Sequence, residues 1–522
     1  MTSWQPARPL GALALALATT VTLPAWGQST PAVTPLPRGQ TLTLMQAWQA
    51  ATQHDRQLDV ARADQAAAQT RRDQAAALWK PSVFVNAGAG WGAGSTRMEG
   101  AQFSAPGMGP MTQANFATSV TDGTATRWGV TLQQPLFSPA RSAQRAQLAL
   151  SADMGDTAWQ AARTDTMLQT AERYLALALA EERVRVLGVQ QQSVARTTQE
   201  AHERFRLGDA PVTDTHEADA ENSGIQAQIA AAMLDLNVRR QALADSTGMA
   251  SPTALLPTDS TWIARAPSGT LATWLDAAHS RNLQLISLRQ ALEMARQNVR
   301  KQAPMAGMSV DLVAQAGQDK LTGSGDFGSG ATTRNTNRMI GVQITIPLYT
   351  GGMASAQQQE AIRLREKAQA QLDATQQQID RQVEAAWWGL QAGQARLQAL
   401  AQARQAMHSR LDATRMGHTL GDRSTLDLLA AESAHAQSVL ALAEARNTQV
   451  LNHLRLAALA NQLDDALLQQ VSQHLTTVPT ATTISAVTPG SSASSRTANG
   501  TRVCQDCTLH RNGMRAHPTR RH

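Results

Sequence analysis

The sequence repeats one set of short motifs about 213 residues apart. The segment 134–137 (Gln-Pro-Leu-Phe) recurs at 346–349 as Ile-Pro-Leu-Tyr, and each copy follows an alternating apolar run and precedes a long Ala- and Gln-rich stretch. A glycine turn also occurs twice, and its residues are Leu207, Gly208 and Asp209 in the first copy and Leu420, Gly421 and Asp422 in the second. An internal repeat of this length indicates one supersecondary unit used twice, here strand, strand, very long helix, tight turn and long helix.

The helical stretches are too long for the inside of a compact domain. A helical pattern runs from about 139 to 207 and again from about 353 to 416. At about 1.5 Å per residue, the first stretch spans on the order of 100 Å. Each stretch turns at a glycine and returns through 213–246 or 424–461, so we expect the helices to pair as coiled coils. A further amphipathic helix is expected from about 42 to 79, before Pro81.

Four segments alternate with the period of a β-strand: 82–91, 127–133, 309–317 and 340–346. Four strands of about ten residues with one apolar face are typical of outer-membrane barrels, although a half-buried soluble sheet has the same alternation. The Gly-rich segments between them, roughly 92–126 and 318–338, are expected to be loops. Because the smallest such barrels have about eight strands, either the sheet is soluble or several chains pool their strands. Helices of this length favour the second arrangement, an oligomeric tube.

The N-terminus has the pattern of a secretory signal peptide over residues 1–27, with Arg8 at its positive end and an apolar stretch too short to span a bilayer. No Cys lies near the expected cleavage before Gln28, which disfavours lipoprotein processing. The predicted organisation is then a linker over 28–40, the first repeat over 41–257, a linker over 258–268, the second repeat over 269–475 and a disordered basic tail over 476–522. Past residue 28 no run of about 18 apolar residues occurs, so any membrane crossing must use strands of a closed barrel.

The formal charge of +6 belongs to the ends of the chain. Residues 496–522 hold six Arg and one Asp, Arg8 lies in the signal peptide, and the residues between are neutral overall. The sequence therefore predicts no nucleic-acid partner. Cys504 and Cys507, the two cysteines, also lie in the tail, where their spacing fits zinc but, with no second pair, a disulfide or no role is favoured. No nucleophile motif, phosphate loop or metalloprotease motif occurs, so we expect neither an enzyme nor a cofactor.

Taken together, these motifs resemble the TolC-type outer-membrane efflux and secretion channels over roughly residues 42–475. The resemblance is carried by 79–83 (Trp-Lys-Pro-Ser-Val), by 134–137, by 346–352 (Ile-Pro-Leu-Tyr-Thr-Gly-Gly) and by 420–427 (Leu-Gly-Asp-Arg-Ser-Thr-Leu-Asp). It implies a mixed α+β membrane protein in which three protomers each give four strands to a twelve-stranded barrel and long helices to a periplasmic α-barrel. Trp91 and Trp128 then suit either an aromatic girdle or ordinary strand packing.

The resemblance also implies partners and a location. The chain would be a homotrimer in outer-membrane lipid, acting as the passive exit duct of a tripartite efflux or type I secretion system. Its periplasmic turns would dock to an adaptor (membrane fusion) protein, and an inner-membrane pump or ABC transporter would supply energy. The alternative from another class is a soluble periplasmic coiled-coil scaffold or adaptor, although the β-domain expected of an adaptor is not visible in the sequence. The transported substrate is left open between drugs, metals and proteins.

The turns carry the gate residues that the resemblance implies. Asp427 matches the Asp of a constriction ring, Arg423 matches an Arg that ties neighbouring helices, and Thr213 and Asp214 match the partners of that network. Ala430 stands where the family has a second ring Asp, which suggests a single acidic ring unless Glu217 contributes. From the residues alone, Asp427 and Asp214 equally suit helix caps or first-turn acids, and Arg423 equally suits a solvated ion pair.

His418 stands where the family has a gate Tyr, and it supplies the first prediction. Protonation of its imidazole at mildly acidic pH is expected to modulate gate opening. Channel conductance measured as a function of pH tests this, because His418→Tyr should lose the dependence. The same pH dependence in His418→Tyr would reject the prediction.

Overall fold

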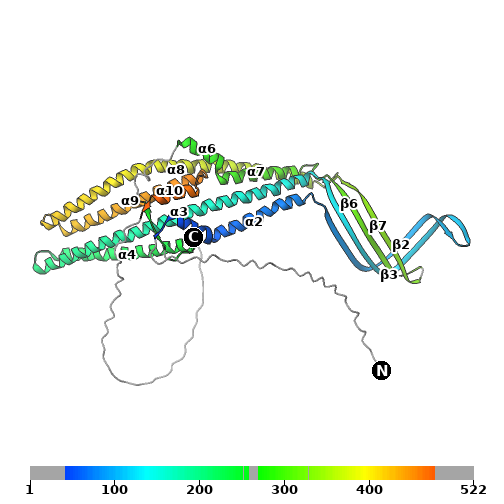
Figure 1. The fold of residues 1–522 in the computed structure, drawn as a ribbon, viewed down its shortest axis with the longest axis horizontal. Helices are drawn as coiled ribbons and strands as arrows, with labels where there is room; N and C mark the ends of the chain where they lie inside the picture. The colour runs from blue at the N-terminus through cyan, green and yellow to red at the C-terminus, as the bar shows by residue number, and fades with distance from the viewer. Residues whose placement is uncertain (1–40, 251, 258–268, 327, 477–522) are drawn as a thin grey trace, which may run out of the picture. The chain divides into compact units, whose positions relative to one another are not determined.

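The computed structural model describes residues 41–250, 252–257, 269–326 and 328–476 (Figure 1). The predicted signal peptide, both predicted linkers, and the tail from residue 477 onward with its two cysteines lie outside the described residues. The predicted repeat boundaries therefore remain a prediction.

One antiparallel sheet receives strands from both copies of the motif set. Its strands are β2 (Ser82–Ala105), β3 (Met108–Phe137), β6 (Ser309–Gly325) and β7 (Gly328–Thr345), in the order β2-β3-β6-β7. The β3–β6 ladder joins the two copies, with Gly129 opposite Gly317. A Cβ at Gly317 would lie 2.8 Å from the Trp128 carbonyl oxygen, so glycine permits the close approach of the two strands here.

The strands are longer than the sequence pattern predicts, and the expected loops at 92–126 and 318–338 were wrong. The β2–β3 ladder continues to Ala105 opposite Met108, and the β6–β7 ladder continues to Gly325 opposite Gly328. The segments are rich in Gly, Ser and Thr and so show little side-chain alternation, but backbone hydrogen bonds form a ladder without it. Because β3 pairs with β6 only from Val120 onward, the residues from 94 to 119 form a two-stranded ribbon beyond the four-stranded sheet (Figure 1).

Each copy continues into a long helical hairpin, as predicted. The first consists of α3 (Pro139–Leu207, 69 residues) and α4 (Val212–Thr247), and the second of α8 (Met353–Thr419, 67 residues) and α9 (Thr425–Leu459). At the start of α3 the Ser138 hydroxyl accepts from the backbone N–H of Arg141, and Pro139 occupies the first helical position, where a missing N–H costs nothing. Among the described residues, none of the helices combines the length and apolar character that crossing a membrane requires.

The helix predicted over 42–79 is two helices, α1 (Leu44–His54) and α2 (Arg56–Ala77). Asp55 separates them, since its side chain caps α2 by accepting from the backbone N–H groups of Gln57 and Leu58 at 2.8 and 3.2 Å. The second copy repeats the break between α6 (Leu271–Arg281) and α7 (Leu283–Lys301), where Asn282 is the cap. Because the helical periodicity continues through both caps, the sequence pattern does not reveal the breaks between the helices.

Short elements pack around the middle of α3. They are α10 (Asp465–Gln473) and two two-residue strand pairs: β1 (Thr41–Leu42) with β4 (Thr253–Ala254), and β5 (Leu256–Pro257) with β8 (Leu475–Thr476). Tyr174 of α3 lies fully buried among them. Its hydroxyl donates to the Leu42 carbonyl at 2.6 Å and accepts from the Leu255 N–H at 2.8 Å. Burial raises the pKa of this phenol above its usual value, so it remains a donor.

Tyr174→Phe is expected to destabilise this region. The substitution leaves a buried carbonyl and a buried N–H without their partner, which costs about 1–3 kcal/mol per group. Denaturant titration of the purified chain measures the free energy of unfolding, and Tyr349→Phe, at a fully open position, is the matched control. Equal stability of the two variants would show that the Tyr174 hydroxyl is dispensable.

Candidate functional site at the helical turns

The two hairpin turns have the same backbone geometry. Gly208 and Gly421 both have φ of 84°, in the left-handed region, and each lies in open space, so conformation rather than crowding requires glycine there. The next N–H reaches back to close the helix: Asp209 N–H donates to the Arg204 carbonyl at 2.9 Å, and Asp422 N–H donates to the Gly417 carbonyl at 2.8 Å. The predicted glycine helix ends are confirmed.

Apolar side chains are exposed at both turns. Leu207 is 76% exposed and Leu420 is 71% exposed, and Val212 and Leu426 beside them are also exposed. Single exposed leucines are common on proteins, but the same exposure at two matching turns presents a repeated apolar surface. The acidic residues Asp209 and Asp422 are exposed next to these leucines.

Asp427 is a capping residue of α9. The Ser424 hydroxyl accepts from the Asp427 N–H at 3.1 Å, and Asp427 Oδ2 accepts from the Ser424 N–H at 3.3 Å, which together form a capping box. The first-turn interpretation of Asp427 is therefore confirmed. Its side chain remains exposed, so capping does not exclude a further role.

Asp214 links the two hairpins. It lies in the first turn of α4, and its Oδ2 accepts from the Thr425 Oγ1 of α9 at 3.2 Å. Thr425 is buried, whereas Asp214 is half-buried, so water is only partly excluded from this bond. Sequence reasoning missed Thr425 as a site residue, although it lies inside the 420–427 motif, because only the packing of α4 against α9 brings it to Asp214.

The other predicted site residues are not brought together within one chain. Among the described residues, Arg423 forms no ion pair and the Thr213 hydroxyl no hydrogen bond, and both are exposed. Gly417 leaves room for Arg423, since a Cβ there would lie 2.8 Å from Arg423 Cγ. His418 is 5% exposed in the last turn of α8, so its ring is packed inside the hairpin.

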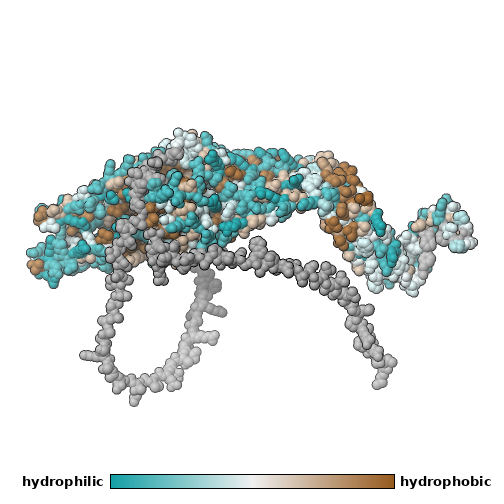
Figure 2. All heavy atoms as spheres, in the orientation of Figure 1, coloured by the Kyte–Doolittle hydropathy of each residue, from teal (hydrophilic) through white to brown (hydrophobic). Residues whose placement is uncertain are grey.

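Away from the turns, the sheet separates apolar from polar residues as the alternation predicts. One face carries the cross-strand row Val83, Leu132, Ala314 and Ile340, and Ile340 is 75% exposed. Figure 2 shows this apolar surface as a brown band on the strands next to the helices. One step farther along the strands, the same face carries its first charge in the row Val85, Val130, Ala316 and Arg338, and the row Ala89, Thr126, Lys320 and Arg334 adds two more. On the opposite face, Arg127 pairs with Asp319 at 2.6 Å.

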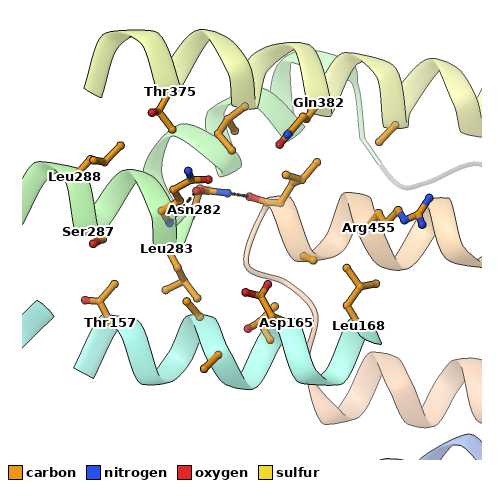
Figure 3. A pocket seen from close by; sticks show the side chains of 18 of the residues that line it. Thr157, Asp165, Leu168, Asn282, Leu283, Ser287, Leu288, Thr375, Gln382 and Arg455 are labelled. Atoms are coloured by element: carbon orange, nitrogen blue, oxygen red, sulfur yellow. Dashed lines mark hydrogen bonds between the residues drawn. The ribbon is translucent and has the colours of Figure 1, made fainter. Parts of the chain in front are cut away.

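A groove of about 1170 Å³ lies between α3 and α8, beside the joint of α7 with the end of α9 (Figure 3). Asn282 forms this joint: its side-chain oxygen caps α7, and its Nδ2 donates to the Leu459 carbonyl at 2.9 Å. Asp165 of α3 lines the groove, and burial raises the pKa of its carboxyl. Among the described residues no cluster of metal-ligating side chains is found, here or elsewhere.

Comparison with known proteins identifies the family to which this fold belongs. Residues 47–249 and 274–462 match the family model described as outer membrane efflux protein. The chain is 25% identical to outer membrane protein TolC of Vibrio cholerae over 349 residues, which is 66% of this chain and 79% of that protein. It is 26% identical over 349 residues to the alkaline protease secretion protein AprF of Pseudomonas aeruginosa, covering 66% of this chain and 71% of that protein.

Solved structures agree with the fold. The outer membrane protein VceC from Vibrio cholerae superimposes with a TM-score of 0.62 at 20% identity, covering 81% of this chain and 97% of that one. The Campylobacter jejuni CmeC outer membrane channel gives a TM-score of 0.64 at 15% identity, covering 83% and 90%. Because the family model spans both copies of the motif set, the chain belongs to the outer membrane efflux protein family, as an outer-membrane exit duct with its helices in the periplasm.

Proposed function

We propose that three copies of the chain close a twelve-stranded barrel through the outer membrane and a tube of helical hairpins below it. The observation that carries the proposal is the open four-stranded sheet, whose edge strands β2 and β7 have 24 and 18 residues. Long unpaired edges invite pairing with another chain. When β2 of one copy pairs with β7 of the next, the interface is head-to-tail, and such interfaces close into rings.

The apolar alternation of β2 has the length that a membrane requires, while β6 and β7 bring Lys320, Arg334 and Arg338 to the same face. The segment 82–91 of β2 holds the apolar alternation, and ten residues at about 3.3 Å each, tilted by about 40°, rise about 25 Å. That height equals the apolar band of outer-membrane barrels. The remaining lengths of β2 and β3 extend beyond the band as polar strands on the external side.

The helical turns form the periplasmic end of the duct, and we assign the gate to them. Three Asp427 carboxylates meeting near the axis repel one another and attract cations. The exposed Arg423 and Thr213, which have no partner in their own chain among the described residues, lie free to bind a neighbouring protomer. His418 is buried one turn before Gly421, so a positive charge on its ring would change the packing of the helices at this turn.

The exposed leucines of the turns offer a docking surface for a periplasmic adaptor. The relative AprF is named for alkaline protease secretion, and the family model is named for efflux, so the cargo is a protein or a small molecule. The soluble scaffold alternative is not supported, because the family match covers both repeats.

Ile340→Arg tests the lipid-facing side of the sheet. An added charge on the lipid face of an outer-membrane barrel costs up to about 2–4 kcal/mol, depending on its depth, so less trimer should reach the outer membrane. Membrane fractionation with chemical crosslinking measures this. Met339→Arg is the matched control, since the adjacent side chain points to the opposite face. Equal assembly of both variants, or a native chain found as a soluble monomer, would refute the barrel.

Thr425→Val tests the link between the hairpins. Valine keeps the shape but removes the donor to Asp214, and a hydrogen bond to a charged group contributes about 1.5–3 kcal/mol. The closed state should lose roughly this stabilisation, and conductance in planar lipid bilayers should rise about tenfold. Thr448→Val, on the same helix with an exposed side chain bonded only within α9, should leave conductance unchanged. Native conductance in Thr425→Val would contradict a role for this link in the gate.

A further inference from the structure

One stripe of α9 residues packs against the first hairpin along the whole length of α9. We call it the α9 stripe, and its buried members are Thr425, Leu429, Glu432, Ala436, Asn447, Val450, Leu454 and Ala457. Apart from the interval between Ala436 and Asn447, the steps between neighbouring members are three and four residues, as in a coiled-coil seam. Leu429 packs with Val194 of α3 and Ile225 of α4, and Leu454 packs in the core cluster that contains Tyr174.

Three members of the α9 stripe are polar, and each is hydrogen-bonded across the seam. Thr425 bonds to Asp214, and Asn447 Nδ2 donates to the Leu175 carbonyl at 2.8 Å. Glu432 is the charged member: Ser193 Oγ of α3 donates to its Oε1. Glu432 is only 4% exposed, an unusual environment for a carboxylate.

The carboxylate of Glu432 is incompletely satisfied. Arg415 of α8 approaches Oε1 at 3.3 Å, but the Arg415 side chain is half exposed, so water screens this pair. Oε2 is buried and has no hydrogen-bond partner among the described residues. A buried acceptor without a partner weakens the packed state relative to one in which water reaches it.

The space beside Glu432 does not reach the unpaired oxygen, because Oε2 is itself buried. A cavity of about 130 Å³ lies between α3, α8 and α9, and its lining includes Ser193, Arg415, Glu432 and His435. A cavity of this volume can hold several water molecules. Burial, followed by the charges of His408 and Arg415, lowers the pKa of His435. The His435 ring is therefore neutral at neutral pH, and Arg415 is the cation that compensates Glu432.

We infer that Glu432 keeps the seam between the two hairpins separable and so determines how readily the duct opens. In the packed state the carboxylate costs stability, and when α9 moves away from α3 it regains water. A seam with an apolar residue at this position would hold the hairpins together more tightly. The inference rests on the proposed gated duct, and it adds a positioning residue about one and a half helical turns from Asp427.

Substitutions on the two sides of the seam should act in opposite directions. Glu432→Met replaces a buried charge with an apolar side chain of similar length, a change that is often stabilising, so the open probability in planar bilayers should fall about tenfold. Ser193→Ala removes a donor and leaves Glu432 less satisfied, so the open probability should rise severalfold. Glu432→Gln keeps the shape and hydrogen-bonding capacity of the side chain without its charge. Its open probability should lie between those of the native chain and Glu432→Met.

A control and a second readout separate this role from general destabilisation. Glu444→Met changes an exposed acid on the same helix and should leave opening unchanged. Hydrogen exchange of backbone amides at 425–439 should slow in Glu432→Met and quicken in Ser193→Ala, whether or not the channel conducts. If pores of Glu432→Met open and exchange their amides as the native pores do, this inference is overturned while the proposed duct stands. A native chain that forms no pore would overturn the proposed duct as well.

Discussion

The ladder between β3 and β6 is the interaction on which the rest of the molecule depends. It joins the two copies of the motif set within the sheet and fixes which residues share a face, from Gly129 opposite Gly317 to Leu132 opposite Ala314. It also fixes the end of the sheet at which both helical hairpins begin. Since α3 has 69 residues and α8 has 67, both turns end at nearly the same distance from the sheet. Asp214 and Thr425 can therefore meet, although 211 residues separate them in the chain.

The two ends of this unit are stabilised by different physics. In the sheet, long ladders of backbone bonds, interrupted at a few irregular positions, leave little freedom for one strand to move alone. Near the turns, small apolar contacts and isolated hydrogen bonds such as Thr425 to Asp214 hold the hairpins together. Local opening favours segments with few buried apolar contacts. This difference supports the proposal that the duct gates at the turns while the barrel above them stays fixed.

The sequence predicted most of the fold because long periodic patterns are robust. Sustained helical periodicity gave the extents of α3 and α8 within a few residues, and alternation gave the two faces of the sheet. The strand lengths were wrong because the Gly- and Thr-rich extension of β2 and β3 carries no side-chain signal for backbone pairing. The breaks at Asp55 and Asn282 were missed because a cap inside a periodic stretch looks like an ordinary polar position. Thr425 and Glu432 were missed for another reason: their importance arises only from partners on distant helices.

For the turns, the sequence allowed two interpretations of Asp427, and the geometry makes them compatible. The capping box uses Oδ2, which accepts from the Ser424 N–H, whereas a carboxylate offers about four acceptor sites on two oxygens. Capping fixes the side-chain orientation and leaves Oδ1 to face water or a cation. In the proposed trimer the cap prepares the Asp427 carboxylate for a ring of charge, because little further rotamer entropy is lost when three protomers meet. Asp214 differs, since its bond to Thr425 uses the carboxylate within the protomer. Of the two matching acids, one therefore forms a contact between the hairpins, and the other is left available for the proposed gate.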